Sequence, residues 1–120
     1  MLKVHTKTLG EVTVLCLQGQ IVTGETSTLR DAVLSQSEVS AVILDLSRVS
    51  RIDAGGLGVL LELRGQTLSR HIEFKFMNVP KLLRQVLEMT RLDSVFEISS
   101  ENVVAAHARG SSVLQFAPCA

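Results

Sequence analysis

Residues 41–46 are the part of the chain that most constrains its fold. They read Ala-Val-Ile-Leu-Asp-Leu, so Asp45 is the one polar side chain in an otherwise apolar run. A strand with apolar side chains on both faces needs cover on both faces, and such strands are typically central and parallel to their neighbours. The run therefore predicts an α/β protein built around this strand.

Strand and helix patterns alternate on both sides of that run. Residues 3–8 and 11–17 flank Gly10 and predict a β-hairpin, while 19–26 read as a polar loop punctuated by glycine. Further strands are expected at 72–77 and 95–98, and helices around 29–33, from 57, after 78, and more weakly at 100–109. This order predicts one domain over 1–110 with a mixed, mostly parallel sheet of about five strands, followed by a tail at 111–120.

Length and charge exclude several kinds of partner. The chain has 120 residues, which suits one domain, and its twelve basic and twelve acidic residues cancel. With no field of one sign, nucleic acid and anionic membrane surfaces are not expected partners. The sequence shows no signal peptide and no apolar run long enough to span a bilayer, so we expect a cytoplasmic protein without membrane insertion.

Neither cysteine nor histidine forms a recognisable catalytic or metal-binding pattern. Cys16 and Cys119 lack CxxC spacing, which argues against a metal site and a disulfide framework. We expect a buried thiol at Cys16 and a free thiol in the tail. His5, His71 and His107 are scattered and lie near no plausible nucleophile. The prediction is a protein that is not an enzyme and has no cofactor.

The stretch Asp-Ala-Gly-Gly-Leu-Gly at residues 53–58 is the best candidate for a site. It leads from a strand into a helix, whose first N–H groups are unpaired and electropositive. A nucleotide loop is one interpretation, but GxGxxG is not satisfied and Asp53 would repel phosphate. A second is a docking site where small residues admit a partner. Asp53 is also expected to cap the helix, which is compatible with docking.

Residues 42–47 and 49–61 together resemble the signature of the STAS family. The matching segments are Val-Ile-Leu-Asp-Leu-Ser and Val-Ser-Arg-Ile-Asp-Ala-Gly-Gly-Leu-Gly-Val-Leu-Leu. The resemblance implies a STAS fold with helices packed mainly on one side of the sheet. Relatives of this size are anti-sigma-factor antagonists in partner-switching pathways. They bind an anti-sigma factor, often a serine kinase, and phosphorylation of a Ser or Thr in a D-S-S-G stretch breaks the complex.

This chain departs from the family pattern at the phosphoacceptor position. Ala54 and Gly55 stand where the resemblance places hydroxyl groups, so no phosphoacceptor is expected there. Val22 stands where many antagonists carry an acidic residue. Hydroxyls nearby, including Thr23, are interpreted as ordinary turn residues, because Ser and Thr form local hydrogen bonds in turns.

The predicted function is therefore protein binding, with an anti-sigma factor or serine-kinase-like protein as the partner. The predicted binding residues form two neighbouring loops: Thr23, Gly24, Glu25, Asp53, Ala54, Gly55, Gly56 and Leu57.

Two other functions stay open, as do the oligomeric state and the role of the C-terminal tail. A nucleotide or lipid-derived anion could bind at the helix start, or the chain could be the STAS subunit of another assembly such as a lipid-transport complex. A homodimer is also compatible with the sequence. The apolar tail residues Val113, Leu114 and Phe116 could fold back, mediate dimerisation or stay disordered.

Overall fold

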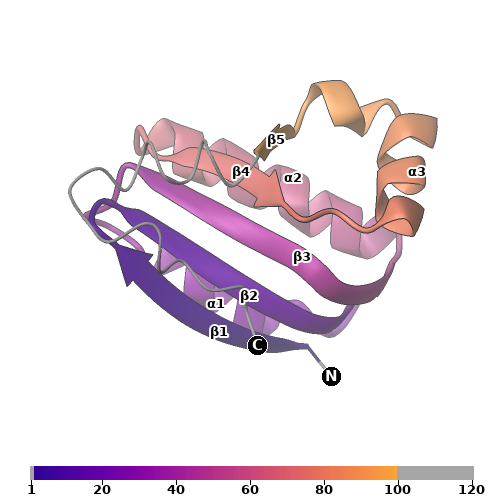
Figure 1. The fold of residues 1–120 in the computed structure, drawn as a ribbon, viewed down its shortest axis with the longest axis horizontal. Helices are drawn as coiled ribbons and strands as arrows, with labels where there is room; N and C mark the ends of the chain where they lie inside the picture. Colours follow the sequence, from indigo (N-terminus) through magenta and orange to yellow (C-terminus); the bar gives the residue numbers. More distant parts are fainter. Residues whose placement is uncertain (1, 100–120) are drawn as a thin grey trace.

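The computed structural model describes residues 2–99 (Figure 1). The predicted helix at 100–109 and the tail at 111–120 lie outside these residues. The elements follow the order β1 (Lys3–Leu9), β2 (Val12–Ile21), α1 (Ser27–Leu34), β3 (Ala41–Ile52), α2 (Ala54–Ser69), β4 (Glu73–Met77), α3 (Lys81–Met89), a 3₁₀ turn η1 (Leu92–Ser94) and β5 (Glu97–Ser99).

All five strands belong to one sheet in the order β1-β2-β3-β4-β5. β1 and β2 form an antiparallel hairpin, and every other neighbouring pair is parallel. β3 lies in the middle, where Leu44 is in register with Leu15 of β2 and Phe76 of β4. The predicted single α/β domain with a mixed, mostly parallel five-stranded sheet is confirmed.

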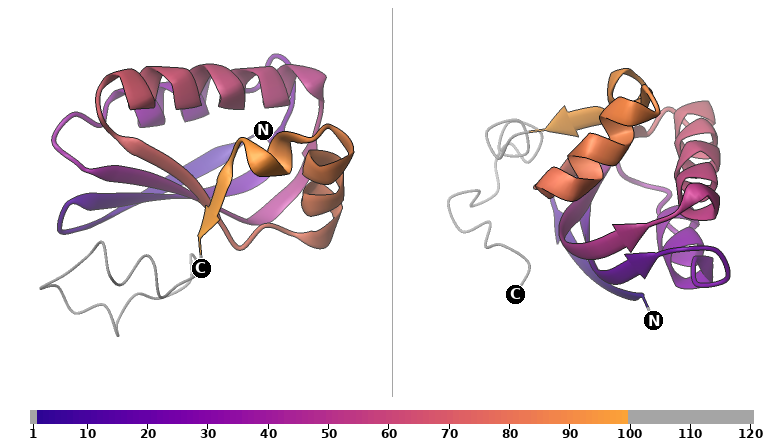
Figure 2. Two further views of the ribbon diagram at one scale, coloured as in Figure 1. Left: turned by 90° about the horizontal axis from the view of Figure 1, so that it is seen from above. Right: turned by 90° about the vertical axis from the view of Figure 1, so that its right-hand side faces the viewer.

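The two faces of the sheet carry separate apolar clusters. Side chains alternate along β3, so Val42, Leu44 and Leu46 point toward the helices, whereas Ala41 and Ile43 point to the other side. We call the first the helical face and the second the outer face. α1 and α2 lie together over the helical face (Figure 2). The expectation that the helices pack mainly on one side is confirmed.

Three phenylalanines close the helical face beside β4 and β5. The rings of Phe76 and Phe96 stack with centroids 4.5 Å apart, and Phe74 meets Phe76 edge-on at 5.8 Å. Offset and edge-on arrangements are the ones that aromatic quadrupoles favour. Leu83 and Leu87 of α3 join the same cluster, which holds the last helix and the short last strand to the domain.

The expected bounds of β2 and β5 differ from the structure. β2 continues to Ile21 through residues expected to be a loop, because Gly19 adopts φ +121° and the register shifts there like a β-bulge. Val95 does not begin β5: its N–H bonds the carbonyl of Leu92 and completes the 3₁₀ turn.

Replacing Phe76 by alanine tests the aromatic cluster. Phe76 is fully buried, so we expect Phe76→Ala to lower the free energy of unfolding by about 3–5 kcal/mol, measured by urea denaturation. Leu82 is 61% exposed, and Leu82→Ala is the matched control with an expected change within about 0.5 kcal/mol. Equal losses in the two variants would show that the cluster is not part of the stabilising core.

Candidate functional site

The carboxylate of Asp53 joins the two loops that the sequence singled out. Asp53 is the N-cap of α2, where its Oδ1 accepts the N–H of Gly56 at 2.8 Å. Both carboxylate oxygens also accept the N–H of Thr23 at 3.1 Å, thirty residues earlier in the chain. The backbone N–H of Asp53 in turn bonds the carbonyl of Ile21 at 3.3 Å. One side chain thus fixes the start of α2 against the end of β2.

The loop after β2 is a tight turn. The N–H of Glu25 bonds the carbonyl of Val22 at 3.0 Å, and Gly24 has φ +87°. Glycine adopts such positive φ values without the steric cost that side chains meet. The turn leaves Thr23 and Gly24 exposed beside the first turn of α2.

Gly55 and Gly56 bring α2 into close contact with this loop. A Cβ on Gly56 would lie 2.0 Å from the carbonyl oxygen of Ile21, so only glycine fits there. A Cβ on Gly55 would lie 1.9 Å from the hydroxyl oxygen of Thr23. The Thr23 hydroxyl therefore occupies the space that a side chain at position 55 would take.

The structure brings all eight predicted binding residues to one end of the sheet but gives them different roles. Gly56 and Leu57 are buried, so they lie beneath the surface and are not accessible to a partner. The remaining six form the part that a partner can reach, which we call the docking surface: Thr23, Gly24, Glu25, Asp53, Ala54 and Gly55. The sequence did not point to Ile21 as part of this site. Its carbonyl oxygen accepts the backbone N–H of Asp53 and leaves no room for a Cβ at position 56.

The charge on Asp53 is stabilised by the hydrogen bonds it accepts. Those from the backbone N–H groups of Gly56 and Thr23 lower the pKa of Asp53 below 3.8, with smaller lowering by the Thr23 hydroxyl and Arg51. Asp53 is therefore ionised at neutral pH. An anion placed at the start of α2 would meet this negative charge, which disfavours the nucleotide or lipid-anion interpretation there.

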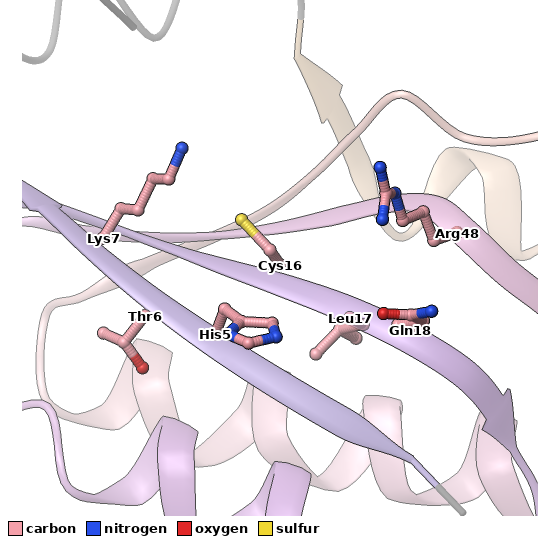
Figure 3. A pocket seen from close by; sticks show the side chains of 7 residues that line it. All are labelled: His5, Thr6, Lys7, Cys16, Leu17, Gln18 and Arg48. Atoms are coloured by element: carbon pink, nitrogen blue, oxygen red, sulfur yellow. The ribbon is translucent and has the colours of Figure 1, made fainter. Parts of the chain in front are cut away.

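A separate pocket of about 230 Å³ lies on β1, β2 and β3 (Figure 3). It is lined by His5, Thr6, Lys7, Cys16, Leu17, Gln18 and Arg48, and it includes none of the predicted binding residues. Cys16 is buried as expected, but it is disulfide-bonded, so the expectation of a thiol there is wrong. Cys119, expected to be a free thiol, lies outside the described residues.

Asp45, the polar residue of the central strand, has a structural environment. Its carboxylate accepts the N–H of Ser47 at 2.9 Å and the side-chain amide of Asn78 at 3.2 Å, which links β3 to the turn after β4. Within residues 2–99, no three His, Cys, Asp or Glu side chains gather as a metal site would require. Over the same range no helix is long and apolar enough to cross a membrane.

The pH dependence of stability tests the role of the Asp53 charge. Because the folded pKa is depressed, the carboxylate contributes stability above its ordinary pKa of 3.8 and loses it as pH falls through the lower folded value. We expect wild type to melt above Asp53→Asn at pH 7 and the gap to close below pH 3.8. A gap that stays constant down to pH 2 would contradict a charge-dependent cap.

Substitution of two glycines in α2 tests the close packing. Gly56→Ala forces a Cβ against the carbonyl of Ile21 and should destabilise by about 1–3 kcal/mol. Gly58 has open space around it, so Gly58→Ala should stabilise by up to about 1 kcal/mol through helix propensity. Thermal unfolding of both variants measures the difference, and stabilisation by both would refute the packing argument.

Known proteins resemble this chain both in sequence and in fold. The family model for the STAS domain matches residues 3–106. An anti-sigma factor antagonist from Mycobacterium paratuberculosis superposes with a TM-score of 0.75 at 20% identity, covering 89% of this chain and 94% of that one. The phosphorylated form of the Bacillus cell fate determinant SpoIIAA gives 0.66 at 18% identity, covering 89% and 100%.

A third similar structure comes from a different setting. A sulfate transporter family protein from Wolinella succinogenes superposes with a TM-score of 0.68 at 21% identity, covering 86% of this chain and 89% of that one. At identities this low, the similar structures show a shared fold alone. The match to the family model covers most of the sequence and therefore shows the family. The chain belongs to the STAS domain family.

Proposed function

We propose that this protein is a non-enzymatic binding module that docks onto an anti-sigma factor or serine-kinase-like protein through the docking surface. The observation that carries the proposal is the Asp53 carboxylate, which holds two loops together and leaves Thr23, Gly24 and Ala54 exposed on one side. A rigid surface of small side chains loses little conformational entropy on binding and lets a partner approach the backbone.

The fold of antagonist relatives supports this choice of partner. The Mycobacterium paratuberculosis protein is an anti-sigma factor antagonist, and the fold it shares covers nearly all of both chains. Docking of this kind requires no catalytic group, and the polar contacts of Asp53 fit a structural cap.

The docking surface suggests how phosphorylation would act on this chain. SpoIIAA exists in phosphorylated and unphosphorylated forms. Here Ala54 and Gly55 carry no hydroxyl, but the exposed Thr23 hydroxyl fills the space beside Gly55. A phosphoryl group on Thr23 adds about −1.5 to −2 charges next to the ionised Asp53. Such repulsion would disturb the loop, so we propose Thr23 as the alternative position for a charge-based switch.

Another assembly is the second candidate function. The Wolinella succinogenes structure shows that the same fold occurs in the sulfate transporter family. In that case the partner would be a membrane transport protein, and not an anti-sigma factor or a serine-kinase-like protein.

Pull-down with the purified chain tests the proposal. Wild type and Thr23→Val are expected to recover an anti-sigma factor or serine-kinase-like protein from native extract, because valine keeps the shape of threonine. Thr23→Glu should lose at least about 90% of that protein, since it places a negative charge beside Asp53. Mass spectrometry of the recovered proteins gives the readout.

The control is the same substitution far from the docking surface. Thr8 is exposed on β1, and Thr8→Glu should bind like wild type. Recovery of the same partner by Thr23→Glu and wild type would move the interface elsewhere. Recovery of a membrane transporter in place of an anti-sigma factor would favour the second candidate.

A further inference from the structure

Two side chains of α3 are the most exposed large apolar side chains among residues 2–99. Leu82 is 61% exposed and Met89 is 83% exposed. They lie seven residues apart, which corresponds to about two turns of the helix, and the half-buried Val86 lies one turn after Leu82. The three side chains form one row along the helix, which we call the α3 stripe.

The α3 stripe lies on the outward side of the helix. Leu83 and Leu87 are buried in the cluster on the helical face, and each residue turns by about 100° around the helix axis. Leu82 and Met89 therefore point away from the core, with Val86 at its edge. Because α3 lies at one end of the domain (Figure 1), another molecule can reach this side of the helix.

Lys81 and Glu88 carry opposite charges along one flank of the α3 stripe. Each directly precedes an exposed residue of the stripe, so the two are also seven residues apart and share one side of the helix. In a heptad that has Leu82 and Met89 at its a positions, Lys81 and Glu88 are the g positions. Both side chains are exposed, and neither forms an ion pair with another described residue.

A second α3 packed antiparallel would bring these opposite charges together. A two-fold axis perpendicular to both helices puts the same flank of each helix on the same side of the contact. With this axis between Gln85 and Val86, Leu82 lies level with Met89 of the second copy. Lys81 is then offset from Glu88 of the second copy by two residues, or about 3 Å along the axis, which both side chains can bridge. The symmetry repeats the pair at the other end.

The other exposed leucines lack this self-complementary charge. Leu61 and Leu68 lie on α2 with the same spacing of seven residues. Glu62, which follows Leu61, already pairs with Arg30 of α1 at 2.8 Å, and Ser69 stands seven residues after it. Charge complementarity with a second copy is thus a property of α3.

We propose that the α3 stripe is the contact surface of a symmetric homodimer. The two α3 helices pack antiparallel, and Lys81 of each copy pairs with Glu88 of the other. Since α3 has nine residues, the contact is smaller than the about 1,200 Å² of lasting interfaces, and the dimer is weak and concentration-dependent. The α3 stripe shares no residue with the docking surface, so the dimer presents two docking surfaces to partners.

Sedimentation equilibrium of the full chain tests for the dimer. At low ionic strength, the average mass should rise from that of a monomer toward that of a dimer between about 10 µM and about 1 mM protein. A monomer at every concentration would overturn the proposal. So would a dimer that survives denaturing electrophoresis without reduction, because a disulfide would then join the copies.

Charge reversal tests the antiparallel pairing. Lys81→Glu and Glu88→Lys should each weaken association about tenfold, because each replaces two attractions by two repulsions. An equal mixture of the two variants should associate like wild type, since a copy with two lysines then faces a copy with two glutamates. Failure of the mixture to recover association would contradict this pairing.

Two further variants separate the α3 stripe from the rest of the helix. Met89→Asp should abolish association, because it places a charge within the apolar contact. Arg84 is exposed on the opposite side of α3, and Arg84→Glu should associate like wild type. Circular dichroism verifies that each variant is folded. Equal association of wild type and Met89→Asp would place the dimer contact elsewhere and overturn the proposal.

Discussion

The carboxylate of Asp53 is the interaction on which the geometry of the site depends. It accepts N–H groups from Gly56 in α2 and from Thr23 in the loop after β2, so two connections far apart in sequence share one anchor. Without this carboxylate, no side chain would hydrogen-bond both the start of α2 and the turn at 22–25. Because parallel strands end at the same edge of a sheet, β2 and β3 bring both connections within reach of one side chain.

The central strand explains why the two faces of this small domain differ. β3 is apolar on both sides, so neither face can be left open to water. The helical face is covered by α1, α2 and α3, and the docking surface lies where α2 leaves the sheet edge. The apolar side chains of the outer face are also buried, and none of them belongs to the docking surface.

Sequence patterns predicted the elements better than the details that shape the site. The apolar run at 41–46 and the Asp-Ala-Gly-Gly stretch were enough to predict the sheet and the cap at Asp53, because burial and capping follow from local residue types. The extension of β2 through Gly19 depends on pairing with β3, which no local pattern shows. Likewise, the contact between Gly55 and the Thr23 hydroxyl joins segments over thirty residues apart, and the disulfide at Cys16 has no sequence signature.

Hydrogen exchange on the free and partner-bound protein tests most directly whether the Asp53-anchored loops are the interface. The partner is the protein that wild-type bait recovers, and mass spectrometry reads exchange peptide by peptide. We expect slower exchange on binding in residues 22–25 and in the first turns of α2, with little change in α3. Protection confined to α3, or to β1 and the outer face, would contradict docking at this surface.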